Sequence, residues 1–230
     1  MATLPMEHSR RLVSVVPVFT GTGRWLAAVV VAVAGPVLQA IEFALEGDAG
    51  EPVARVADWA ANPARIGLAM ASGFLAVPFL ICGVAVLVAL TRQHSRRLAW
   101  LAATFMTFGM AGLAAVHGYE MAAYGLVQSG NQTAAIAVLN GDTLGVPGAV
   151  LLLTFFGGAA LGTITLAVAA WRSPFVPRIV VVFMLAFAAL DFAAGYGVAS
   201  HLVNLAGFVI LAGALVRGYS RRESQVGLPG

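Results

Sequence analysis

The chain has 230 residues, of which 60% are hydrophobic and only 10% are charged, and its formal net charge is +3 at pH 7. A soluble domain of this size carries about a quarter charged residues, so the composition excludes a soluble protein and indicates one surrounded by lipid. Every basic residue is an arginine, and no basic run alternates with aromatic residues, which argues against nucleic-acid binding.

Residues 1–24 are too polar to span a membrane, and we expect them to form a cytoplasmic or interfacial segment. Six apolar stretches follow, which meet or nearly meet the roughly 20 residues needed to cross a hydrocarbon core of about 30 Å. The predicted spans are 25–45, 66–90, 98–127, 147–171, 179–199 and 201–216. The sequence thus predicts an all-α integral membrane protein with a six-helix transmembrane domain at 25–217 and a cytoplasmic tail at 218–230.

The connections and one span carry local patterns of their own. The segment after the first span is acidic, with Trp59 as an interfacial anchor and Asn62–Pro63 as a turn into the second span. An amphipathic piece at 131–140 is expected to lie on the membrane surface. In the fourth span, Gly158 and Gly162 have the spacing of small residues that let two membrane helices approach closely.

Arginine positions predict the orientation in the membrane. If all six stretches span, eleven of the thirteen arginines lie on the side that holds both termini, and only Arg55 and Arg65 lie on the other side. Positive charge favours the cytoplasmic side. We therefore expect a multi-pass protein of a bacterial-type plasma membrane with both termini in the cytoplasm.

Ionisable side chains inside the spans are the strongest functional signal. With a rise of 1.5 Å per residue, Glu42, His117, Glu120 and His201 reach the outer third of the membrane, and Asp191 lies just past the midplane. A carboxylate near the midplane costs about 2.5–3.5 kcal/mol on insertion scales, so Asp191 is expected to face the bundle interior and to be functional. Near the span ends, by contrast, a charged group can also reach the interface at little cost.

Helical spacing adds neighbours to these residues. His117, Glu120 and Tyr124 share one face of the third span, and Gln39 and Glu42 share one face of the first. On the last two spans, the same half holds Phe187, Phe192, Tyr196 and Asn204. The sequence therefore predicts a polar and aromatic pocket in the outer half of the bundle.

Acid catalysis inside the membrane is the chemistry we favour for this pocket. A carboxyl group in apolar surroundings can keep its proton at neutral pH and act as a general acid. Protonation of an alkene or epoxide in a prenyl chain gives a carbocation, which aromatic rings stabilise. We expect Asp191 to donate the proton and Glu42 or Glu120 to be the second carboxylate. The expected substrate-binding residues are Gln39, His117, Tyr124, Phe187, Phe192, Tyr196, His201 and Asn204.

The chain resembles the small membrane-bound terpene cyclases, which include a bacterial type acting on prenylated indole diketopiperazines. The resemblance covers the whole chain in its size, its apolar bundle and its carboxylates on separate helices without an aspartate-rich metal motif. No motif matches position by position, so no residue's role is taken from the family. The resemblance implies a cyclase or isomerase that works without a metal or other cofactor, with a lipid-soluble prenylated small molecule and the bilayer as partners.

Other interpretations stay open at this stage. His117, Glu120, Glu42, Asp191 and His201 offer nitrogen and oxygen ligands suited to zinc, iron or manganese, but the usual histidine pattern of zinc-dependent membrane hydrolases is absent. Acidic and histidine side chains in a bundle also serve proton-coupled transport, although the cytoplasmic halves of the spans hold no notable polar residues. A non-catalytic sensor or assembly subunit would match no motif in the chain.

Overall fold

The computed structural model describes residues 22–47, 50–142, 144–193 and 197–226. Within these ranges the secondary structure is helical, as predicted. The helices are α2 (Thr22–Glu46), α3 (Pro52–Ala61), α4 (Pro63–Thr91), α5 (Arg96–Gln128), α6 (Gln132–Leu139), α7 (Gly145–Trp171), α8 (Arg178–Ala193) and α9 (Val198–Val226). Among these, five contain segments long and apolar enough to cross a membrane: Leu26–Glu46, Pro63–Thr91, Arg96–Gln128, Gly145–Trp171 and Val198–Gly218.

Each predicted span coincides with one long helix, and the largest differences are at α8 and α9. The fifth span was expected at 179–199, whereas α8 ends at Ala193, after 16 residues. That length corresponds to about 24 Å of helix. The last helix runs to Val226, so part of the predicted tail continues α9. Residues 1–21 of the predicted N-terminal segment lie outside the described residues.

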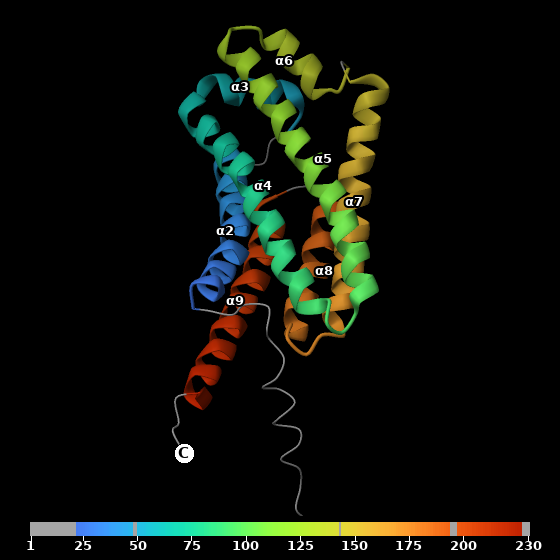
Figure 1. The fold of residues 1–230 in the computed structure, drawn as a ribbon. Coiled ribbons are helices and arrows are strands. Elements are labelled where there is room, and N and C mark those ends of the chain that lie inside the picture. Colours follow the sequence, from blue (N-terminus) through green and yellow to red (C-terminus); the bar gives the residue numbers. More distant parts are fainter. Residues whose placement is uncertain (1–21, 48–49, 143, 194–196, 227–230) are drawn as a thin grey trace, which may run out of the picture.

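The six long helices form a closed ring. Contacts run from α2 to α4, α5, α7, α8 and α9 in turn, and α9 packs back against α2. The short helices α3 and α6 lie together at one end of the ring (Figure 1). The α4–α5 and α7–α8 turns and the last turns of α9 lie at the opposite end, which we call the arginine end.

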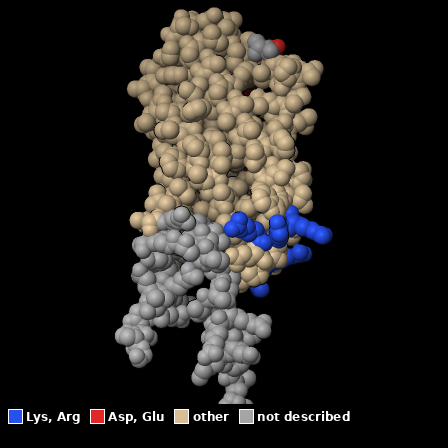
Figure 2. Space-filling view, viewed as in Figure 1, with Lys and Arg blue, Asp and Glu red and all other residues tan. Residues whose placement is uncertain are grey.

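Charge is distributed unevenly along the ring. The turns at the arginine end carry Arg92, Arg96, Arg97, Arg172 and Arg178. Figure 2 shows arginines gathered in a band at this end, while the wall beyond them is almost free of charge in this view. An uncharged wall flanked by a basic band is the surface that a membrane-embedded bundle requires.

Buried apolar side chains fill the ring toward the arginine end. They come from all six long helices and the α7–α8 turn, and form one cluster: Ala28, Ala32, Val86, Leu87, Leu90, Ala102, Leu166, Ala167, Ala170, Val176, Val180, Val181, Met184, Phe208, Leu211 and Leu215. The buried ionisable side chains Glu42, Glu46, His117 and His201 lie outside this cluster.

The acidic connection after α2 folds into helix α3, which the sequence did not predict. Pro52 and Pro63 occupy the first turns of α3 and α4, where proline is well tolerated. Trp59 is fully buried against Ile66 and Met70 of α4, so it anchors α3 to protein rather than to the membrane interface as predicted. The predicted turn at Asn62 is present, and the Asn62 N–H donates to the Asp58 carbonyl at 2.9 Å.

Glycines bring α5 and α7 into close contact. A Cβ at Gly158 would overlap the backbone of Gly109, and one at Gly112 would lie 2.6 Å from the Cα of Phe155. Gly162 is equally tight against α5, so the predicted small-residue face is confirmed. Because the helix backbones touch here, the aromatic residues of α7 lie next to the polar residues one to two turns further along α5.

Candidate functional site

A cavity of about 130 Å³ lies inside the ring, and we call it the bundle cavity. All six long helices contribute side chains to its wall. Seven predicted site residues line it: Gln39, His117, Phe187, Asp191, Phe192, His201 and Asn204. Four further aromatic side chains join them: Phe43, Phe155, Phe156 and Phe208. The structure therefore brings most of the predicted pocket together on one largely apolar cavity.

Asp191 is the one carboxyl group among the described residues that line the bundle cavity. Its Oδ1 accepts a hydrogen bond of 3.0 Å from the hydroxyl of Ser200 at the start of α9. Ser200 also contacts the carbonyl of Gly197 at 2.9 Å. The aspartate side chain is thus oriented from one side by a neutral donor, and it forms no ion pair with another described residue.

His201 is a buried imidazole in aromatic surroundings. It is 2% exposed, and neither ring nitrogen makes a hydrogen bond to a described residue. Its ring centroid lies 3.9 Å from that of Phe43 and 5.5 Å from that of Phe187. Because an unpaired buried polar group is costly, these nitrogens are available to a molecule that enters the bundle cavity.

A second cavity of about 440 Å³ adjoins the first between α2, α3, α5 and α7, and we call it the side cavity. The two cavities share five lining residues: Phe43, Leu113, His117, Phe155 and Phe156. Glu42, Glu46, Arg55 and Glu120 line the side cavity and not the bundle cavity. The structure therefore separates Asp191 from Glu42 and Glu120, which the sequence grouped as one catalytic set.

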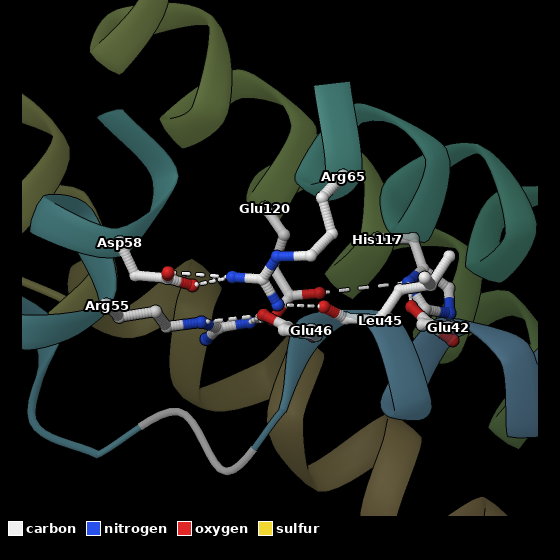
Figure 3. A network of polar contacts seen from close by, with 8 residues as sticks. All are labelled: Glu42, Leu45, Glu46, Arg55, Asp58, Arg65, His117 and Glu120. Atoms are coloured by element: carbon white, nitrogen blue, oxygen red, sulfur yellow. Dashed lines mark hydrogen bonds and ion pairs between the residues drawn. The ribbon is translucent and has the colours of Figure 1, made fainter. Parts of the chain in front are cut away.

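The charged residues of the side cavity form one network (Figure 3). His117 Nδ1 lies 3.3 Å from Glu42 Oε1 and 3.7 Å from Glu120 Oε2. The other oxygen of Glu120 accepts a hydrogen bond of 2.7 Å from Arg55 Nη2. Arg55 also donates through Nε to Glu46 Oε1 at 2.9 Å. We call Glu42, Glu46, Arg55, His117 and Glu120 the carboxylate cluster.

A glycine on α4 fixes the position of Glu42. A Cβ at Gly73 would overlap the Glu42 carboxylate, so this side chain lies directly against the α4 backbone. On its other side stands His117 of α5. Glu42 is only 3% exposed, and the fit between α4 and α5 leaves its carboxylate little room to move.

Arg55 is the fixed cation of the carboxylate cluster. Burial alone would lower its pKa, but the neighbouring carboxylates of Glu120 and Glu46 outweigh that effect and raise the pKa. The guanidinium also lies over the Trp59 ring, 4.9 Å from its centroid, which attaches it to the buried part of α3. One permanent positive charge thus faces three carboxyl groups.

Tyr124, a predicted site residue, is not among the described residues that line either cavity. The hydroxyl of Tyr124 donates to the carbonyl of Pro63 at 2.6 Å, and its ring packs against Trp59 at the α3/α6 end. Tyr124 therefore ties α5 to α3 and α4, and it was expected to bind substrate. Tyr196 lies outside the described residues.

Sequence reasoning missed Glu46 and Arg55 as members of the site. Both were assigned to a polar connection, because neither lies within a predicted span. One signal was present: Arg55 is one of two arginines on a side otherwise rich in acidic residues. A lone cation among carboxylates inside an apolar protein is expected to pair with them.

Comparison of the chain with models of protein families, with curated proteins and with solved structures found no match. The fold and the site therefore define the class of protein on their own. It is a multi-pass helical membrane protein with an aromatic internal cavity and a buried carboxylate cluster beside it.

Proposed function

We propose that this protein is a membrane-bound terpene cyclase or isomerase, which starts its reaction by protonating a prenylated, membrane-soluble substrate. The observation that carries the proposal is the bundle cavity, with one carboxyl group among its described lining residues and aromatic rings around it. Apolar walls suit a hydrocarbon substrate, and a carboxyl group in such a place is suited to general-acid catalysis.

Asp191 is the proton donor in this proposal. Ser200 holds Oδ1, which leaves Oδ2 to carry the proton. Transfer of this proton to an alkene carbon uses the π electrons for the new C–H bond and leaves a carbocation on the other carbon. Phe187 and Phe192 on the same helix, and Phe43 opposite, offer ring faces to that charge. Ring closure followed by loss of a proton to the imidazole of His201 gives a product isomeric with the substrate.

Glu42 and Glu120 take no part in this proton transfer, because they line the side cavity. His117 lies on both walls and is the one member of the carboxylate cluster that meets a substrate in the bundle cavity. Gln39 and Asn204 supply polar contacts that orient an oxygen- or nitrogen-bearing part of the substrate.

The proposal includes a topology of six spans with both termini in the cytoplasm of a bacterial-type cell. The position of α8 in the ring, between α7 and α9, supports its role as a sixth span despite its 16 residues. The basic band supports a cytoplasmic arginine end. The substrate cavity then lies in the outer half of the membrane.

Cysteine labelling tests this topology. In a Cys82→Ala background, an impermeant thiol reagent added to intact cells is expected to label Asn140→Cys after α6 and to leave His94→Cys in the α4–α5 turn unlabelled. Both positions are exposed. The reverse pattern would show that the protein has the opposite orientation.

Turnover by the reconstituted protein tests the function. The full chain in liposomes is incubated with prenylated indoles and with longer polyprenyl alkenes and epoxides, and products are identified by mass spectrometry. Loss of a general acid slows a reaction by about 10²–10⁴-fold, which is the expected effect of Asp191→Asn. Asp142→Asn removes an exposed carboxyl group and is the matched control. Full activity in Asp191→Asn would reject the assigned proton donor.

A further inference from the structure

We infer that Glu42, His117 and Glu120 bind a divalent transition-metal ion at the junction of the two cavities. Each residue offers one ligand atom, and these atoms lie within 4.8 Å of one another. Asp191 and His201, which the sequence placed in the same possible ligand set, are not members of this group. The sequence left a metal site open as an alternative, and the inference assigns it to these three residues; it stands independently of proton donation by Asp191.

The spacing of the ligand atoms fits a metal ion. Imidazole and carboxylate ligands bind zinc at about 2.0–2.2 Å, so two ligands at a tetrahedral angle are about 3.3–3.6 Å apart. His117 Nδ1 lies 3.3 Å from Glu42 Oε1 and 3.7 Å from Glu120 Oε2. Two of the three ligand–ligand distances therefore need almost no adjustment.

The imidazole of His117 is buried without a hydrogen bond to the described part of the chain, and Nδ1 faces the two carboxylates of the proposed ligand set. Its side chain is 6% exposed, and neither ring nitrogen makes a hydrogen bond to a described residue. Oε2 of Glu42 is also buried without a hydrogen bond. Unpaired buried polar atoms are costly, and a cation bound to His117 Nδ1 and to the Glu42 carboxylate would offset part of that cost.

Charge balance favours the same ligand. The cluster holds the carboxyl groups of Glu42, Glu46 and Glu120, and Arg55 is the one permanent cation paired with them among the described residues. With all three carboxyl groups ionised, as ligation requires of Glu42 and Glu120, a divalent ion would neutralise the excess negative charge. Because Arg55 binds Oε1 of Glu120, it leaves Oε2 directed at His117, which is how outer groups orient metal ligands.

One nitrogen and two oxygen ligands suit zinc, iron or manganese rather than calcium or copper(I). Three protein ligands leave at least one coordination position open, as in catalytic metal sites. The side cavity provides space for a water molecule or a substrate oxygen at that position. If the proposed function holds, an ion here would bind an oxygen-bearing group of the substrate while Asp191 acts on its prenyl chain.

Zinc titration of the purified full chain tests the inference. The protein is prepared in detergent with an affinity tag that contains no histidine, stripped with a chelator and titrated by isothermal calorimetry. One Zn²⁺ per chain is expected. Since loss of outer-shell partners alone costs about 10–100-fold in affinity, we expect at least about 100-fold weaker binding in His117→Ala and in Glu42→Gln.

Two further variants test whether zinc binding depends specifically on the three proposed ligands. His201→Asn removes a buried imidazole outside the ligand set and is expected to leave the affinity unchanged. Glu46→Gln removes a nearby carboxylate and is expected to weaken binding by less than about 10-fold. Absence of stoichiometric zinc in the wild type, or equal affinity in folded His117→Ala and wild type, would overturn the inference. Neither result depends on finding a substrate.

Discussion

The bundle cavity and the side cavity share five lining residues but differ in how their polar groups are paired. In the side cavity, Arg55 joins two carboxylates by ion pairs, and His117 approaches two as well. In the bundle cavity, the described residues offer Asp191 one neutral hydrogen-bond donor and His201 none. We therefore expect loss of the ion pairs beside the side cavity to destabilise the protein, whereas the proposed function assigns the polar groups of the bundle cavity to contacts with a substrate.

The largest loss of stability is expected at the contact between α5 and α7, because both helices contribute to the walls of both cavities. Gly158→Leu places a side chain into the backbone of Gly109, so α5 and α7 cannot approach. We expect no folded, monodisperse protein in size-exclusion chromatography. Gly157→Leu is the matched control, because a Cβ at Gly157 meets nothing within 4 Å. Normal folding of Gly158→Leu would contradict the close packing described.

The second-largest loss of stability is expected when the ion pairs of the carboxylate cluster are broken. Arg55→Met leaves the buried Glu46 and the partly buried Glu120 without their cation, which costs up to about 3–5 kcal/mol. With about 2–4 °C per kcal/mol, the unfolding temperature should fall by about 10 °C. Arg65→Met is the control: Arg65 pairs with Asp58, the two side chains are 37% and 38% exposed, and such a pair contributes about 0–1 kcal/mol. If both variants lowered the unfolding temperature equally, the ion pairs of Arg55 would be no more important for stability than the exposed pair of Arg65 and Asp58.

A smaller change can displace the Glu42 carboxylate of the side cavity and leave the residues that line the bundle cavity in place. Gly73→Ala places a methyl group against the Glu42 carboxylate, and such overpacking costs about 1–3 kcal/mol. Thermal unfolding should show the loss, while turnover in the bundle cavity falls less than in Asp191→Asn. Gly118→Ala, at an open position of α5, should be neutral or stabilising, because alanine favours a helix over glycine. A Gly73→Ala protein as stable as the wild type would place Glu42 elsewhere.

The smallest expected change in stability is in the bundle cavity. His201→Phe keeps the contacts with Phe43 and Phe187 and removes two unpaired polar atoms. The unfolding temperature should stay the same or rise slightly. Turnover should nevertheless fall, since the proposed proton acceptor is lost. A large drop in stability would show that His201 belongs to a structural network after all.

The helices of the bundle were predictable because long apolar runs bounded by arginines admit few other structures in a membrane. The start of α9 at Val198, within the predicted fifth span, was not predictable, because residues 197–200 carry no strong helix-start signal. Helix α3 was missed because its Arg55 and Asp58 are typical of an exposed loop. Its burial depends on contacts of Trp59 with α4, and spacing along the chain does not reveal such contacts.

The depth of the site residues in the membrane was predictable, but the direction in which each side chain points from its helix was not. A rise of 1.5 Å per residue placed Glu42, His117 and Glu120 at similar depth, and the structure brings them together. Depth does not say how each helix is rotated about its axis. That rotation decides that Glu120 faces Arg55 and that Asp191 faces the other cavity. Tyr124, one turn beyond Glu120, already packs against the α3/α6 end.

The most direct test of the central claim is turnover in D₂O. If the protein protonates an alkene in the bundle cavity, a cyclised or isomerised product formed in D₂O carries a single deuterium at the protonated carbon. Mass spectrometry of the product should show this label in the wild type, and Asp191→Asn should give almost no product. A product formed without deuterium would contradict acid initiation, and a labelled product formed at full rate by Asp191→Asn would contradict the assignment of the acid.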